Sequence, residues 1–495
     1  MSAATHSRTA PEDRIKFSHK LAYGAGAFVN NLLSAAIGGM MIILNLGLHM
    51  DPRMVGWVSA LPRLVDTIID PIMGYVSDNT RSRWGRRRPF IFVGAILTAV
   101  VFALLWQLPR DASQHFYFVW FLIGSVIFYI CYTIFVAPWV ALGYELTPDY
   151  NERTRLMGTQ NFIGQFAYVV SPWFLWIMNG GRFGDQIAGA GWLAVAVAIC
   201  TVALGVLPAV FLRERMASLA TTATAAHKAE AAARAGNPIL RNVGEFFRGF
   251  ASTMSTIPFL KLCLATFLVF NGFILISAFS SYVIIYYVSG GDQGLGAKWV
   301  GLAGTVGAVG SFGAVALVTV LATRIGKRRA LMISTAISMV GYALKWVCYN
   351  PAHPWTVLLP APLLAFGLGG LFTLVPSMIA DVVDADELRT RQRREGMFSS
   401  VFWFTVKLGL TAALAGGGYL LTATGFAVEL GGAQGQRTIT LLRLFDAGVP
   451  VVTSAIAIWA VATYPITEAR ALAVRRELEE RRGKTGPVVS EDAPS

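Results

Sequence analysis

Long apolar stretches separated by short polar segments dominate the chain. A helix needs about 20 apolar residues to cross the hydrocarbon core of a bilayer, and twelve stretches reach this length. The predicted spans cover residues 21–48, 54–76, 89–108, 116–143, 156–180, 188–212, 258–288, 299–323, 328–349, 355–381, 396–424 and 444–465. Because backbone groups in lipid must bond within their own segment, the pattern predicts an all-α polytopic membrane protein with twelve transmembrane helices.

Composition supports this assignment. Hydrophobic residues make up 55% of the 495 residues and charged residues 14%, whereas soluble domains carry roughly 25% charged residues. The first twenty residues are polar, so we expect no cleavable signal, and the first span serves as the targeting element. The four cysteines lie in apolar stretches without metal-ligand spacing, so we interpret them as packing residues.

Basic residues predict the orientation. With the N-terminus in the cytoplasm, 31 of the 41 Lys and Arg residues fall in cytoplasmic segments and 6 in outer loops. Such loops stay on the cytoplasmic side, so we expect both termini in the cytoplasm and the protein in the inner or plasma membrane. The net charge of +13 therefore reflects orientation in the membrane rather than nucleic acid binding.

A polar segment divides the spans into two sets of six. We expect an N-terminal bundle with its tail over 1–212, a cytoplasmic linker over 213–257, a C-terminal bundle over 258–465 and a cytoplasmic tail over 466–495. The second part of the linker has apolar residues at helical spacing. This spacing predicts an amphipathic helix on the membrane surface, with a disordered linker as the alternative.

Matched loops indicate an internal repeat. The basic run 85–88 after the second span corresponds to 326–329 after the eighth, at an offset of 241 residues. The same offset carries Glu145 onto Asp386 and places Arg153 on Arg394. Two six-helix halves in parallel orientation resemble the plan of the major facilitator superfamily, in which the substrate site lies near the midplane between the halves.

Two acidic residues lie deep in the second span. Asp66 and Asp70 are four residues apart and share one helical face. Two carboxylates this close repel each other in a low dielectric unless a cation or a proton lies between them. The pattern therefore favours a coupling-ion site for Na⁺ or H⁺. The alternative is a structural pair balanced by Arg63 or by a neighbouring helix, and Arg63 itself either contacts substrate or balances the aspartates.

One lysine of the eleventh span lies at the same depth as these aspartates. Lys407 is roughly 16 Å from the inner end of its span and Asp66 roughly 15 Å from the inner end of its own, at 1.5 Å per residue. A lysine this deep needs an opposite charge, so we expect it to pair with Asp66 or Asp70 when no cation is bound. Lys345 and Lys261 lie near span ends, where we expect their side chains to snorkel to the surface.

Charges of both signs crowd the cytoplasmic loops after spans two, four, eight and ten. Ion pairs between the halves would close the inner side and release it during transport, and a lipid-headgroup role is the alternative. The candidate gate residues are Asp78, Arg86, Arg153, Asp381, Asp384 and Arg394.

These motifs together resemble the glycoside–pentoside–hexuronide:cation symporters. The resemblance covers spans one to five and ten to eleven, and its main motifs are the run from Arg63 to Gly74 and the stretch from Ala380 that leads into Lys407. It implies that Asp66 and Asp70 bind the coupling cation, with Thr133 beside them and Lys407 nearby. No further cofactor is implied.

The sugar-binding positions differ from that family. Where it carries charged residues on spans one, four and five, this chain has Asn31, Val136 and Asn161, while Tyr132 stands as in the family. Polyols are usually held by charge-assisted hydrogen bonds. A less polar cavity fits a glycoside with a hydrophobic aglycone or a lipid-like solute, and the further candidate substrate contacts are Tyr23 and Trp403.

We therefore expect a cation-coupled symporter of a small organic solute, a sugar or glycoside, that works by alternating access as a monomer in the bilayer. The alternatives are a symporter of a lysolipid-like solute and a proton-driven exporter. An enzyme is disfavoured because all six histidines lie in tails or loops and no metal-ligand spacing occurs. A channel or receptor is the remaining class, and it would not accumulate substrate against a gradient.

Overall fold

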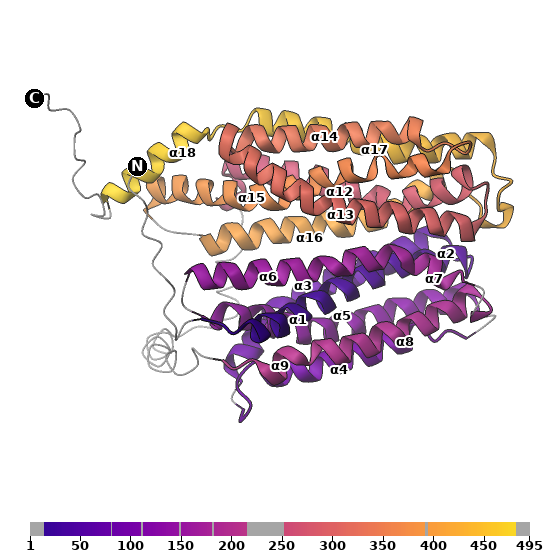
Figure 1. The fold of residues 1–495 in the computed structure, drawn as a ribbon, viewed down its shortest axis with the longest axis horizontal. Helices are drawn as coiled ribbons and strands as arrows, with labels where there is room; N and C mark the ends of the chain where they lie inside the picture. The colour runs from indigo at the N-terminus through magenta and orange to yellow at the C-terminus, as the bar shows by residue number, and fades with distance from the viewer. Residues whose placement is uncertain are drawn as a thin grey trace, which may run out of the picture.

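The structure is a computed structural model that describes residues 14–80, 82–109, 112–147, 150–180, 183–214, 252–391 and 395–481. These residues form helices and no strands. The long helices run roughly along one axis of the molecule (Figure 1). We call the end of the bundle where α1 begins and α18 lies the terminal end, and the opposite end the distal end.

The N-terminal half is drawn in indigo to magenta in Figure 1. Its elements are α1 (Phe17–Met40), α2 (Ile42–Leu46), α3 (Pro52–Asn79), α4 (Arg88–Leu105), α5 (Gln114–Glu145), α6 (Tyr150–Val170), η2 (Ser171–Trp173), α7 (Phe174–Met178), α8 (Gln186–Gly205) and α9 (Leu207–Phe211).

The C-terminal half lies beside it, in orange to yellow along most of its length. Its elements are α12 (Ile257–Tyr282), the π-helix η4 (Val283–Val288), α13 (Gln293–Ile325), α14 (Lys327–Cys348), η5 (Pro354–Leu358), α15 (Ala361–Thr390), α16 (Glu395–Ala423), η6 (Val428–Leu430), α17 (Gln436–Ala462) and α18 (Glu468–Arg481). The last of these, α18, contacts the terminal end of α15.

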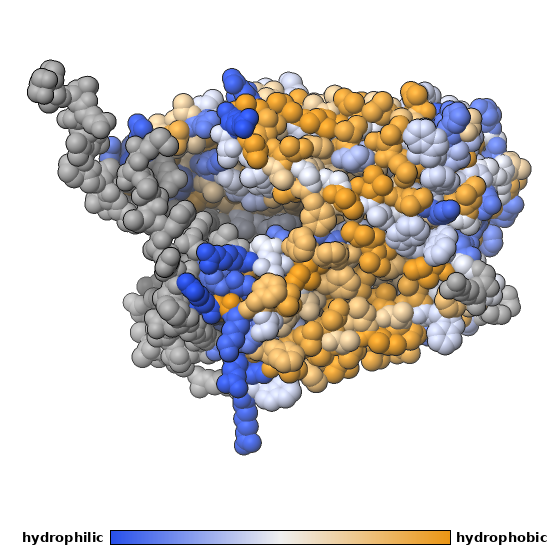
Figure 2. All heavy atoms as spheres, viewed as in Figure 1, coloured by the Kyte–Doolittle hydropathy of each residue, from blue (hydrophilic) through white to orange (hydrophobic). Residues whose placement is uncertain are grey.

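Helical structure occurs at all twelve predicted spans, although α17 begins at Gln436, before the predicted start at 444. Within the described residues, ten helical segments are long and apolar enough to cross a membrane. The two others, α3 and α6, lie in the same bundle, where α3 packs against α5 and α16, and α6 packs against α1. Figure 2 shows apolar residues over the middle of the bundle and hydrophilic residues toward both ends, as expected for a membrane protein.

Side-chain caps mark where the helices start at the distal end. The carboxylate of Asp51 accepts a hydrogen bond from the Arg53 amide at 2.7 Å at the start of α3. Ser113, Asp185 and Asp292 cap α5, α8 and α13 in the same way. Each cap satisfies an amide that the first helical turn leaves without a partner.

The predicted repeat is visible at the terminal end. Gly85 and Gly326 precede α4 and α14 with φ of 103° and 84°, a conformation that favours glycine. The basic residues that follow pair with an acid of their own half, Arg86 with Glu145 at 2.5 Å and Lys327 with Asp381 at 2.8 Å. The matched loops thus adopt matched conformations, but Lys327 pairs with Asp381 rather than with Asp386, the residue at the repeat offset.

Among the described residues, the two halves share an apolar core toward the distal end. One core cluster joins Met50 and Leu46 of the N-terminal half to Ile285 and Phe426 of the C-terminal half. A second cluster, at the terminal end, belongs to the C-terminal half alone. Between the halves, Figure 2 shows the surface hollowed toward the terminal end. The described parts of the two halves are therefore packed together at the distal end and lie apart toward the terminal end on the face that Figure 2 shows.

The predicted linker helix over the second part of 213–257 lies outside the described residues, apart from the last few positions.

Candidate functional site

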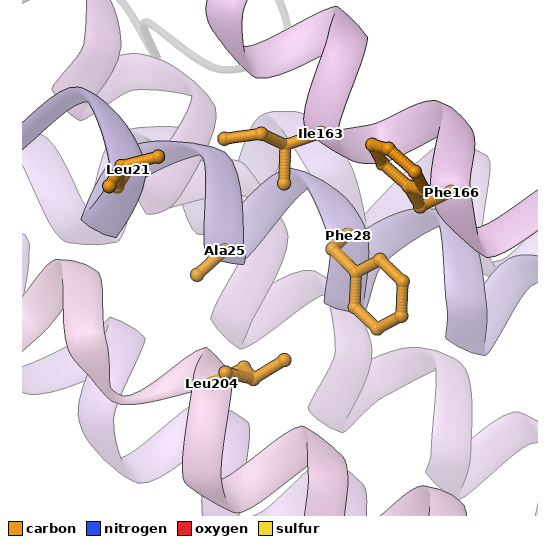
Figure 3. A pocket seen from close by; sticks show the side chains of 6 residues that line it. All are labelled: Leu21, Ala25, Phe28, Ile163, Phe166 and Leu204. Atoms are coloured by element: carbon orange, nitrogen blue, oxygen red, sulfur yellow. The ribbon is translucent and has the colours of Figure 1, made fainter.

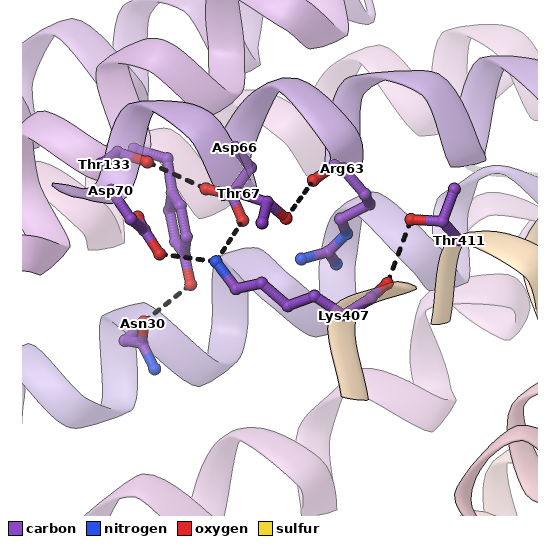
Figure 4. A network of polar contacts seen from close by, with 9 residues as sticks. Asn30, Arg63, Asp66, Thr67, Asp70, Thr133, Lys407 and Thr411 are labelled. Carbon is purple, nitrogen blue, oxygen red and sulfur yellow. Dashed lines mark hydrogen bonds and ion pairs between the residues drawn. The ribbon is translucent and has the colours of Figure 1, made fainter. Parts of the chain in front are cut away.

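A charged cluster joins the two halves near the middle of the bundle. The ammonium of Lys407, on α16, lies 2.5 Å from Asp70 Oδ2 and 3.2 Å from Asp66 Oδ2, both on α3. The hydroxyl of Thr133, on α5, donates to Asp66 Oδ1 at 2.9 Å (Figure 4). The predicted contact between Lys407 and the two aspartates is present, and it links α16 of one half to α3 of the other.

The two aspartates differ in access to solvent. The side chain of Asp66 is 7% exposed, whereas those of Asp70 and Lys407 are 43% and 29% exposed. An ion that arrives through the open side of the site would therefore meet Asp70 before Asp66. Hydroxyl and carboxylate oxygens are ligands for hard cations, so Asp66, Asp70 and Thr133 could hold Na⁺, or an aspartate could hold a proton.

Arg63 lies one turn before Asp66 on the same helix. Its guanidinium is stacked over the ring of Tyr129, with Cζ 4.6 Å from the centroid. Within the described residues, no carboxylate lies within ion-pair distance of it, and Figure 4 shows it on the side of α3 that faces Lys407. The four groups Arg63, Lys407, Asp66 and Asp70 sum to zero charge, which limits the electrostatic cost of burying them.

A polar ladder lies beside this cluster on α1 and α5. The hydroxyl of Tyr132 donates to Asn30 Oδ1 at 2.7 Å, and Asn30 Nδ2 donates to Asn31 Oδ1 at 3.1 Å. Sequence reasoning included Asn31 and Tyr132 but missed Asn30, the residue that connects them. Asn31 also packs closely against Gly164 of α6, because a Cβ at Gly164 would lie 2.8 Å from Asn31 Nδ2.

The other candidate substrate contacts lie in different environments. Asn161 is exposed on α6, and Trp403, 48% exposed, stacks on Phe372 with ring centroids 6.3 Å apart. Tyr23 is only 1% exposed and stacks on Trp139. Tyr23 therefore has no free face for a solute in this conformation.

Two of the candidate gate residues, Arg86 and Asp381, form ion pairs within their own halves. Arg86 contacts Glu145, and Asp381 contacts Lys327; Asp384 also has a polar contact. The side chains of Asp78, Arg153 and Arg394 lie outside the described residues. Neither Arg86 nor Asp381 forms an ion pair with a described residue of the other half.

One expectation is wrong. Lys345 does not snorkel, because its ammonium turns inward and lies 2.9 Å from Asp446 Oδ1 of α17, with both side chains 3% exposed or less. The hydroxyl of Ser280 bridges them, donating to Asp446 at 2.7 Å and accepting from Lys345 at 2.6 Å. Asp446 was missed because it lies at the edge of its predicted span, and no local pattern reveals its partner.

A separate crevice lies between α1, α6 and α8 (Figure 3). Its lining is entirely apolar and consists of Leu21, Ala25, Phe28, Ile163, Phe166 and Leu204. With no polar group, it offers nothing that could bind a hydroxyl or an ion, so the charged cluster is the better candidate site.

Comparisons with known proteins agree with this architecture. A family model described as MFS/sugar transport protein matches residues 22–468. An uncharacterized symporter of Synechocystis is 27% identical, covering 96% of this chain and 99% of its own. The sodium-dependent lysophosphatidylcholine symporter 1-B of Danio rerio is 23% identical, covering 95% and 91%.

A solved structure shares the fold. A D-xylose-proton symporter superposes with a TM-score of 0.61 at 14% identity, covering 92% of this chain and 99% of its own. The fold is thus the predicted all-α major facilitator fold, and the protein is an integral membrane transporter rather than an enzyme. The family match extends over nearly all of the chain, which therefore belongs to the sugar transport proteins of the major facilitator superfamily.

Proposed function

We propose that the protein is a cation-coupled symporter of a glycoside, with Asp66, Asp70 and Thr133 as the cation site. One observation carries the proposal: Lys407 of one half contacts both aspartates of the other half. Charged groups this deep in a membrane protein usually mark an ion pathway.

In this mechanism Lys407 acts as a tethered substitute for the coupling ion. A cation that binds between Asp66 and Asp70 competes directly with the ammonium for the same oxygens. Displacement of Lys407 removes the ion pair between α3 of one half and α16 of the other. Because this ion pair holds the two halves together at the site, cation binding changes how readily the halves move relative to each other. Arg63 stays charged beside the site whether Lys407 or a cation contacts the aspartates, and its positive charge partly balances the negative charge of the carboxylates.

The residues around the cluster support a solute that carries both hydroxyl groups and an apolar part. The amides of Asn30, Asn31 and Asn161 can donate to and accept from hydroxyls. The exposed face of Trp403 offers apolar surface for a sugar ring or an aglycone. The family's description as sugar transport proteins favours a glycoside.

A lysolipid-like solute is the second candidate. It is favoured by the absence of an ionised side chain at Asn31, Val136 and Asn161, and by the lysophosphatidylcholine symporter among the relatives. A proton-driven exporter would use the same carboxylates but would move solute in the opposite direction.

We further infer that the terminal end faces the cytoplasm, because basic residues concentrate in its loops. We infer a monomer with two transport bundles over 1–212 and 258–465, a linker over 213–257 and a tail over 466–495. When the halves rock together, loop charges could exchange partners across the interface and close the terminal end. The proposed gate residues are Asp78, Arg86, Arg153, Asp381, Asp384 and Arg394.

The test measures cation binding and transport separately. Purified protein is scanned for thermal stabilisation by Na⁺ and by H⁺ alone, and then with aryl glycosides or lysolipids, because a ligand of the native state raises apparent stability. We expect cation-dependent stabilisation in the wild type and its loss in Asp66→Asn and Asp70→Asn. In vesicles, accumulation of the stabilising solute should require the cation gradient.

The control is Asp292→Asn, which changes a helix-capping aspartate at the distal end of α13. It should keep both cation stabilisation and accumulation. Gradient-driven accumulation that survives in the doubly neutralised Asp66→Asn/Asp70→Asn protein would disprove the proposed site.

A further inference from the structure

The contacts between the halves at the distal end include one fully buried hydrogen bond. The described hydrogen bonds between the halves there run from Trp57 to Tyr419 at 3.0 Å, Trp173 to Thr305 at 2.8 Å, Thr305 to the Val169 carbonyl at 3.4 Å, Gln186 to Gln293, and Tyr282 to Asn45 at 2.7 Å. The first four are exposed or partly buried. By contrast, Asn45 and Tyr282 are each 3% exposed, so their bond lies inside the shared core.

Both partners of this bond are held in place. Asn45, on α2, donates through Nδ2 to the Met50 carbonyl at 2.9 Å, which orients its Oδ1 toward Tyr282. The ring of Tyr282 packs edge-on against Phe426 at 5.0 Å. A buried polar group that loses its partner destabilises the structure, so separation of the halves at this point is opposed until water replaces the hydrogen bond.

The helix changes its geometry at the same residue. Tyr282 ends α12, and η4 follows over Val283–Val288 as a π-helix. A π-turn closes each hydrogen bond over five residues instead of four, and such turns occur frequently at functional sites. Conversion of this segment to α geometry would rotate the residues on one side of it relative to the other. The bond between the halves therefore lies beside a segment that has an alternative regular conformation.

The base of this segment is fixed within the C-terminal half. Two residues before Tyr282, the hydroxyl of Ser280 joins the buried pair of Lys345 on α14 and Asp446 on α17. Lys345 Nζ also lies 5.4 Å from the ring centroid of Tyr342. This cluster ties α12, α14 and α17 together and makes no described contact with the other half.

We propose that the junction of α12 and η4 is the distal gate of the transporter. The Tyr282–Asn45 bond holds the halves together, the Ser280–Lys345–Asp446 cluster fixes the base of the junction, and the π-helical segment changes conformation when the distal end opens. This inference requires alternating access but not a particular cation or solute. Its failure would leave the Asp66–Asp70 site unaffected.

Thiol labelling from the distal face of the membrane tests the proposal. Thr411→Cys places a reporter on α16, one turn from Lys407 toward the distal end, where the native side chain is 8% exposed. A charged, membrane-impermeant thiosulfonate should label it slowly in the otherwise unchanged chain, after subtraction of labelling of the native cysteines. Tyr282→Phe should increase the rate at least about fivefold, because it leaves the buried Oδ1 of Asn45 without its partner and so destabilises the closed state.

The matched control is Tyr286→Phe, since the hydroxyl of Tyr286, one turn further along, makes no hydrogen bond to the N-terminal half within the described residues. It should leave the labelling rate unchanged. If Tyr282→Phe labels no faster than Tyr286→Phe, the Tyr282–Asn45 bond does not hold the gate. Rapid labelling of Thr411→Cys before any gate residue is changed would also overturn the proposal.

A second pair tests the base of the junction. Ser280→Ala removes the bridging hydroxyl and should also raise the labelling rate. Ser277→Ala is its control, because within the described part of the chain that hydroxyl donates to the Ile274 carbonyl of its own helix, at 2.9 Å, and to no other group. Equal rates in these two variants would exclude the cluster as the fixed base.

Discussion

At the scale of single residues, the proposed cation site contains a lysine that competes with the coupling cation for the same carboxylate oxygens. Lys407 contacts Asp66 and Asp70 from the opposite half. An isolated carboxylate pair would repel at this depth, so the lysine stabilises the empty site. The same contact must reduce the affinity of the site for a free cation.

Removal of the Lys407 ammonium should therefore separate binding from transport. In Lys407→Ala, the concentration of Na⁺ or H⁺ that stabilises the protein should be at least roughly tenfold lower than in the wild type. A tenfold change corresponds to about 1.4 kcal/mol of binding free energy. Accumulation of solute should be lost, because nothing displaces the cation after the halves rearrange. Thermal shift and vesicle uptake measure the two effects.

Lys261→Ala is a suitable control, since that lysine donates to the Thr463 carbonyl at the terminal end, away from the site. It should change neither quantity. Cation-dependent accumulation at the wild-type level in Lys407→Ala would contradict the role of this lysine.

Much of the site was predictable from the sequence because charge inside an apolar span is conspicuous. Asp66, Asp70 and Lys407 stand out for this reason, and their matched depths predicted the contact. Asn30 and Asn45 were not predictable, because a single amide in a helix carries no pattern, and its partner lies on a helix distant in sequence.

At the scale of elements, the buried pair of Lys345 and Asp446 holds three helices of one half together. Hydropathy placed Lys345 near the end of its span and suggested that it reached the surface. In the structure α17 begins at Gln436, so Asp446 lies inside this helix rather than at the edge of a span, and it contacts Lys345. Span boundaries read from hydropathy are least reliable at such positions, and an ion pair between helices has no local signature.

Asp446→Asn should therefore destabilise the protein. Breaking a buried ion pair by removing one partner costs about 3–5 kcal/mol, because the remaining charge is buried without compensation. We expect a clear fall in the midpoint of thermal unfolding. The double variant Lys345→Met/Asp446→Leu should recover most of the loss, and an unchanged midpoint in Asp446→Asn would show that the pair is not structural.

At the scale of the whole molecule, the halves approach closely where glycines let a helix of one half lie against the backbone of the other. A Cβ at Gly418 of α16 would lie 2.2 Å from the Pro52 carbonyl oxygen of α3, a backbone atom that cannot move aside easily. A Cβ at Gly56 of α3 would similarly lie 3.0 Å from the carbonyl oxygens of Leu414 and Ala415. This close contact belongs to the closed distal end.

Gly418→Ala should hinder closure of the distal end. We expect solute accumulation to fall several-fold while the protein remains folded, because the two halves can still adopt the state in which they are apart at this point. Gly417→Ala is the matched control, since its Cβ would be 3.7 Å from the nearest atom, the Leu275 carbonyl oxygen. Equal uptake by the two variants would contradict this interpretation of the interface.

The low hydropathy of α3 and α6 has a consequence for how the chain enters the membrane during synthesis. Each charged residue placed at the centre of a helix opposes insertion by about 2.5–3.5 kcal/mol, and α3 carries three such groups, Arg63, Asp66 and Asp70. A nascent segment of this kind is poorly retained by lipid on its own. We therefore expect α3 to leave the insertion machinery together with α4 and α5, so that biogenesis of the N-terminal half proceeds in groups of helices rather than one at a time.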